Sequence, residues 1–87
     1  MTVLNIKNIM RKESPIYYRR FYTGVISLEI NKIVNDYKAE FIIEHKPTGG
    51  KSITIIQIDP INYPVIPLNR ELKSFIENLD KNGELPD

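Results

Sequence analysis

Apolar and polar side chains alternate along residues 37–46, and this period of two is typical of a half-buried β-strand. Phe41 and Ile43 fall on one face of that strand. A second strand-like run, residues 51–59, follows a connection at residues 47–50 that contains two glycines. Glycine supplies the positive φ angles that a tight turn needs. The pattern therefore predicts a β-hairpin over residues 37–59.

The length of the hairpin loop decides which faces of the two strands meet. A two-residue or a four-residue loop gives the same parity, and either places Phe41 and Ile43 on one face with Ile56 and Ile58. We take that face as the core. The opposite face then carries a smaller apolar patch that needs a partner or a covering segment. This predicted interaction face consists of Ile42, Ile53 and Ile55.

Two further stretches alternate in the same way. Residues 3–10 predict a first strand, and residues 16–33 predict either one bent strand or two strands that run almost continuously through Gly24. Residues 34–36, Val-Asn-Asp, predict the turn into the hairpin, because Asn and Asp bond to their own backbone in turns.

The C-terminal third predicts a crossover and then a helix. Residues 59–67 contain three prolines, which confine this stretch to an edge or a loop. Residues 68–79 carry apolar side chains at helical spacing, with Asn69 as the expected N-cap and Gly83 just past the end. The fold class that follows is α+β: an antiparallel sheet of four to five strands with one C-terminal helix packed on one face.

Length and composition narrow the class of protein. The 87 residues are expected to form a single domain, 1–87, with a net charge of +1 and no cysteine. The lack of cysteine excludes disulfides and thiolate metal sites, and near-neutrality argues against strong nonspecific nucleic-acid binding. No apolar run approaches the length of a membrane span, so a soluble, cytoplasmic protein with no membrane association is expected.

Motifs for catalysis are weak. Gly50-Lys51-Ser52 resembles the end of a phosphate-binding loop, but His45 stands where that pattern needs its first glycine, and a strand rather than a helix follows. His45 is the single histidine, and no acidic cluster at ligand spacing lies near it. We therefore expect no catalytic, cofactor-binding or metal-binding residues, and a protein that is not an enzyme.

The strongest candidate for binding is the run Tyr-Tyr-Arg-Arg-Phe-Tyr at residues 17–22. Bases stack on exposed aromatic rings, and arginine adds phosphate and cation–π contacts. The same composition is also common in an ordinary structural strand. If parity is kept through Gly24, Tyr17, Arg19 and Phe21 face outward; a bulge there would exchange the faces. The candidate binding residues are Tyr17, Tyr18, Arg19, Arg20 and Tyr22.

Strands followed by one helix resemble, at the level of fold, the single-stranded-DNA-binding coactivators of the positive-cofactor-4 type, and residues 66–72 (Ile-Pro-Leu-Asn-Arg-Glu-Leu) carry the local similarity. Two functions remain open. The first is a protein-interaction module of the regulator or inhibitor type, which binds a protein partner or forms a homodimer through a sheet face or edge. The alternative is a single-stranded nucleic-acid-binding module that uses residues 17–22.

Overall fold

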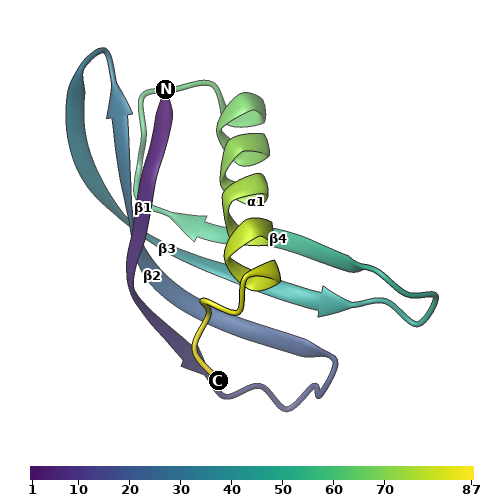
Figure 1. Ribbon diagram of the computed structural model, residues 1–87. Helices are drawn as coiled ribbons and strands as arrows, with labels where there is room; N and C mark the ends of the chain where they lie inside the picture. The colour runs from purple at the N-terminus through teal and green to yellow at the C-terminus, as the bar shows by residue number, and fades with distance from the viewer.

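The computed structural model describes residues 1–87 and has four strands followed by one helix. The strands form one antiparallel sheet in the order β1-β2-β3-β4, and the helix lies across one face of it (Figure 1). This architecture confirms the predicted α+β fold. The elements are β1 (Thr2–Lys12), β2 (Arg19–Ile30), β3 (Ile33–His45), β4 (Lys51–Ile58) and α1 (Val65–Lys81).

A two-residue turn joins β2 to β3. Asn31 and Lys32 have φ angles of 52° and 65°, and two positive φ values in succession define the type I′ turn that matches the twist of a hairpin. The pairing runs without a shift from Ile30↔Ile33 to the far end of both strands. The prediction of a turn at residues 34–36 is wrong, because those residues lie inside β3.

Parity is kept through Gly24 in β2, and the irregularity lies opposite it in β1. The register shifts between Lys7 and Met10, and Asn8 adopts a φ of 54° there. This bulge lets Ile6 and Ile9 both pack toward the core. A Cβ atom at Gly24 would lie 3.1 Å from Cγ2 of Ile6, so the missing side chain is what lets β1 approach.

The loop between β3 and β4 contains five residues, 46–50, rather than two or four. An odd number reverses the predicted parity, so Ile53 lies opposite Ile43 and Ile55 lies opposite Phe41. The assignment of Ile53 and Ile55 to the outer face is therefore wrong, and both pack against the core. The predicted pairing of Phe41 with Ile56 is wrong as well, since Ile56 is 45% exposed.

A second irregularity restores the parity at the end of β4. The register shifts next to Phe41, so Ile56 is an extra residue, and Ile58 comes to lie opposite Ala39 on the core side. The predicted burial of Ile58 on the face of Phe41 therefore holds, although by a different path from the one the sequence suggested.

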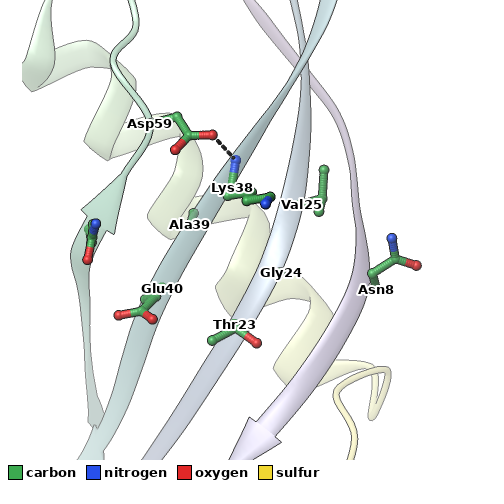
Figure 2. Close-up of a pocket in the computed structure, with 9 residues that line it drawn as sticks. Asn8, Thr23, Gly24, Val25, Lys38, Ala39, Glu40 and Asp59 are labelled. Atoms are coloured by element: carbon green, nitrogen blue, oxygen red, sulfur yellow. Dashed lines mark hydrogen bonds between the residues drawn. The ribbon is translucent and has the colours of Figure 1, made fainter.

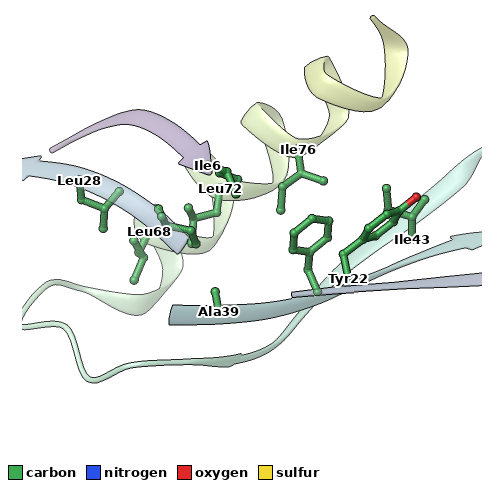
Figure 3. Close-up of a cluster of buried hydrophobic side chains, with 10 residues drawn as sticks. Ile6, Tyr22, Leu28, Ala39, Ile43, Leu68, Leu72 and Ile76 are labelled. Carbon is green, nitrogen blue, oxygen red and sulfur yellow. The ribbon is translucent and has the colours of Figure 1, made fainter. Parts of the chain in front are cut away.

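The core lies between the sheet and α1 (Figure 3). Tyr22 and Phe41 are fully buried neighbours on β2 and β3, with stacked rings whose centroids are 5.2 Å apart. The ten buried apolar residues are Ile6, Tyr22, Ile26, Leu28, Ala39, Phe41, Ile43, Leu68, Leu72 and Ile76.

The helix begins at Val65, three residues before the predicted start. Pro64 is its N-cap and offers no side-chain hydrogen bond, so Asn69 lies inside the helix and the predicted cap is wrong. At the other end, Gly83 has a φ of 71° and its N–H donates to the carbonyl of Asp80, while the N–H of Glu84 donates to the carbonyl of Leu79. These two bonds form a Schellman motif, which confirms Gly83 as the residue that ends the helix.

Candidate functional site

The structure divides the basic-aromatic run into a buried part and an exposed part. Tyr22 is completely buried, and Arg20 is held by the helix. Tyr17 is 94% exposed and Tyr18 is 41% exposed, and both lie in the connection before β2 rather than in a strand. The run therefore does not present one continuous binding strand.

Arg20 joins the sheet to the end of α1. Its two terminal nitrogens donate to the two carboxylate oxygens of Asp80 at 2.9 and 3.0 Å, and one of them also donates to the Tyr22 hydroxyl at 3.1 Å. Lys51 of β4 donates to the same carboxylate. Arg20 and Lys51 together lower the pKa of Asp80 to about 2, and hydrogen bonding to Asp80 raises the pKa of Arg20. The placement of Arg20 and Tyr22 on a ligand-binding surface is wrong, because both take part in holding the fold together.

Tyr17 stands at one end of the sheet between two hollows. Its ring meets the ring of Tyr18 edge to face at 5.6 Å. The N–H of His45 donates to the backbone carbonyl of Tyr18 at 2.9 Å, which holds the connection against the end of β3. The larger hollow, about 600 Å³, is lined by Tyr17, Tyr18, Glu44, His45, Lys46 and Pro47.

The second hollow, about 420 Å³, lies on the other side of Tyr17. The C-terminal tail reaches it, as the position of the C-terminus beside the connection between β1 and β2 shows (Figure 1). Its lining is mainly polar: Arg11, Lys12, Glu13, Ser14, Ile16, Tyr17, Arg19 and Asp87.

Charges of both signs surround this end of the molecule. Arg19 forms an ion pair with Glu44, which raises the pKa of Arg19. Lys12 lies 3.3 Å from Glu40 and 5.5 Å from the centre of the Phe21 ring. Arg11 is exposed and forms no ion pair. We call the surface formed by Tyr17, Tyr18, Arg11, Arg19 and Lys46 the Tyr17 end.

The face of the sheet away from α1 carries cross-strand ion pairs. Lys7 on β1 lies 2.8 Å from Asp36 on β3, and Ser27 on the strand between them donates to the same carboxylate at 2.7 Å. These two hydrogen bonds lower the pKa of Asp36. Ile42 lies half-buried on this face opposite Phe21, and it is the one member of the predicted interaction face that the structure places there.

A shallow hollow of about 350 Å³ opens on the same face (Figure 2). Asp59 continues the sheet beyond β4, because its carboxylate accepts the Lys38 backbone N–H at 2.8 Å and its own N–H donates to the Lys38 carbonyl at 2.9 Å. The lining consists of Asn8, Thr23, Gly24, Val25, Lys38, Ala39, Glu40, Gln57 and Asp59. The hollow contains no nucleophile paired with a base, and its charged groups are those of an ordinary solvated sheet.

The remaining motif residues occupy structural positions. Gly49 and Gly50 have positive φ angles and form the turn before β4, so Lys51 and Ser52 begin a strand rather than a phosphate-binding helix. His45 is exposed at the end of β3. No group of three or more histidine, aspartate or glutamate side chains gathers as a metal site.

Sequence patterns gave no sign of the contacts that span the fold. Arg20 and Asp80 are 60 positions apart, and neither belongs to a motif. One signal was present: Asp80 lies in the last turn of α1, where the helix dipole disfavours a negative charge, so a compensating cation could be expected.

Comparison with known proteins assigns the chain to a family. The model of the BB_0187 family matches residues 1–81. The chain belongs to this family. Neither the curated proteins nor the solved structures contain a match to it. The one helix of this BB_0187-family chain is not long and apolar enough to cross a membrane.

Proposed function

We propose that this chain is a small, non-enzymatic protein-interaction module that contacts its partner through the Tyr17 end. The observation that carries the proposal is the 94% exposure of Tyr17 between two hollows. Such an exposed ring contributes little to the stability of the free chain. Tyrosine and arginine are enriched among the residues that dominate protein–protein binding energy, since they give a large contact area and hydrogen-bonding groups together.

The charge at this end supports a protein partner over a nucleic acid. The two hollows are lined by four cations, Arg11, Lys12, Arg19 and Lys46, and three carboxylates, Glu13, Glu44 and Asp87. Arg19 and Lys12 are already paired with carboxylates of the same chain. A polyanion would meet local repulsion from the carboxylates, whereas a peptide segment of mixed charge can satisfy both signs.

Single-stranded nucleic acid is the second candidate. The edge-to-face pair of Tyr17 and Tyr18 offers an aromatic surface on which a base can stack, and Arg11 carries no ion pair that would compete with a phosphate. This mode predicts weak binding whose affinity falls steeply as salt is added.

Photo-cross-linking separates the two candidates. A photoreactive phenylalanine analogue replaces Tyr17, and a matched variant carries it at Ile33, which is 62% exposed at the β2–β3 turn. In cells that produce the chain, we expect a discrete protein adduct from position 17 and none from position 33. The captured partner, once purified, should bind the unmodified chain, lose affinity on Tyr17→Ala, and keep most of its affinity in high salt.

Two results would contradict the protein proposal. Adducts at position 17 that consist of nucleic acid, together with salt-sensitive binding of labelled single strands, would establish the second candidate instead. Equal adducts from positions 17 and 33 would show that the Tyr17 end has no special role.

A further inference from the structure

The two edges of the sheet differ in how well they are protected against pairing with another strand. β1 carries Lys7, Arg11 and Lys12 and has two register shifts, all of which hinder edge-to-edge association. β4 carries one charge, Lys51 at its start, and the residues that follow, Ser-Ile-Thr-Ile-Ile-Gln-Ile, contain neither charge nor proline. A segment of this composition is prone to add a strand at a free edge.

The regular part of β4 is short but self-complementary. β4 pairs regularly with β3 from Lys51 to Ile55, and the shift that follows makes Ile56 the extra residue. If a second β4 runs antiparallel about a two-fold axis at Thr54, Ile53 of each copy lies opposite Ile55 of the other. Cross-strand pairs of β-branched side chains stabilise antiparallel sheets, and Thr54 meets its own copy across the axis.

This arrangement would extend the core as well as the sheet. A two-fold axis perpendicular to the sheet keeps the helices of both copies on one side. Ile53 and Ile55 lie on that side and are only half-buried in one chain. Each would be covered further by its partner residue from the second copy, which removes apolar surface from water.

Charge does not oppose the approach of two copies. The hollow of about 340 Å³ between the start of β4 and α1 is bordered by Lys51 and Lys73 on one hand and by Glu77 and Asp80 on the other. Its formal charge is therefore zero, so two such hollows meet without net repulsion.

We propose that two copies of this chain associate through β4, antiparallel about a two-fold axis at Thr54, to form one continuous eight-stranded sheet. The β4 edge is separate from the Tyr17 end, so the two proposals stand or fall independently. An isologous contact of this kind closes on itself and gives a dimer rather than a fibre.

Cysteine cross-linking tests the register directly, because the chain has no cysteine of its own. Thr54 is exposed, and Thr54→Cys would bring two sulfurs within disulfide reach across the axis. Gln57→Cys is the matched control in the same strand, where the two positions would be about 20 Å apart. Asn5→Cys serves as the control on the opposite edge.

Under mild oxidation we expect a covalent dimer from Thr54→Cys and monomer from both controls. Sedimentation of the unmodified chain should give an apparent mass that rises toward twice that of one chain as concentration increases, and Thr54→Lys should reduce this association by placing two like charges at the axis. A strictly monomeric chain at high concentration, or a dimer that cross-links through Asn5→Cys or Gln57→Cys instead, would overturn the proposal.

Discussion

The guanidinium of Arg20 and the carboxylate of Asp80 form two parallel hydrogen bonds of 2.9 and 3.0 Å that tie β2 to the last turn of α1. The Asp80 side chain is 9% exposed and that of Arg20 is 19% exposed, so the pair is largely shielded from water. Planar, two-point contacts of this kind fix geometry as well as adding energy.

Asp80→Asn should destabilise the fold by about 1–3 kcal/mol, because it removes the charge that compensates a poorly hydrated arginine. The Nε atom of Arg20 is already buried without a hydrogen-bond partner, so the variant would leave the guanidinium further from satisfied. Lys51→Ala is the control: Lys51 contacts the same carboxylate but is 40% exposed, and its loss should cost less than about 1 kcal/mol. Urea denaturation measures both, and equal losses would contradict the primary role of Arg20.

Acid should weaken the fold through the same carboxylate. Asp80 has a pKa of about 2 in the folded chain against 3.8 for the free side chain, chiefly because Arg20 donates to its charged form. A depressed folded-state pKa stabilises the fold at neutral pH, and this contribution falls as the pH drops from about 4 to 2. Asp36, whose pKa is lowered by Lys7 and Ser27, acts in the same direction.

Thermal unfolding from pH 7 to pH 2 tests this linkage. The midpoint of the unmodified chain should decline most steeply below about pH 4, and the decline should be shallower in Asp80→Asn, which has no proton to take up at that position. Curves of identical shape for the two proteins would show that Asp80 does not titrate with folding.

The local elements of this fold follow from sequence because each depends on neighbouring residues. Alternation predicted the strands of the 37–59 hairpin, and apolar spacing predicted the buried stripe of Leu68, Leu72 and Ile76. The faces of β4 could not be predicted in this way. The sign of the parity depends on whether the loop holds an odd or an even number of residues, and an extra residue at Ile56 reverses it once more.

The candidate site was predictable only in part. Composition marked residues 17–22 as unusual, and the exposure of Tyr17 agrees with an outward-facing side chain. Composition could not show that Arg20 has a partner 60 residues away, because that contact depends on where the end of α1 lies on the sheet.

Phe41→Ala should cost about 3–5 kcal/mol, since the ring is 1% exposed and its removal would leave a cavity against Tyr22. Ile56→Ala is the matched control on the neighbouring strand, where 45% exposure predicts a loss below about 1 kcal/mol. Chemical denaturation of the two variants compares them. A larger loss from Ile56→Ala would mean that the register of β4 is the one first predicted from sequence.

Lys32→Gly should make the chain more stable. Lys32 has a φ of 65° in the β2–β3 turn, a left-handed conformation that costs a residue with a Cβ atom about 1–2 kcal/mol. Glycine avoids that strain but loses more backbone entropy on folding, so the net gain should be about 0.5–1 kcal/mol, and Asn-Gly is the preferred pair for a type I′ turn.

Lys38→Gly is the control for that substitution, because Lys38 is also exposed but lies in the extended backbone of β3. There the change should lower stability by about 0.5–1 kcal/mol, since glycine weakens a strand without relieving any strain. Opposite signs in the free energy of unfolding would establish the left-handed turn at Asn31 and Lys32. A loss in both variants would instead place the turn elsewhere, as at residues 34–36, and would shift the pairing of β2 with β3.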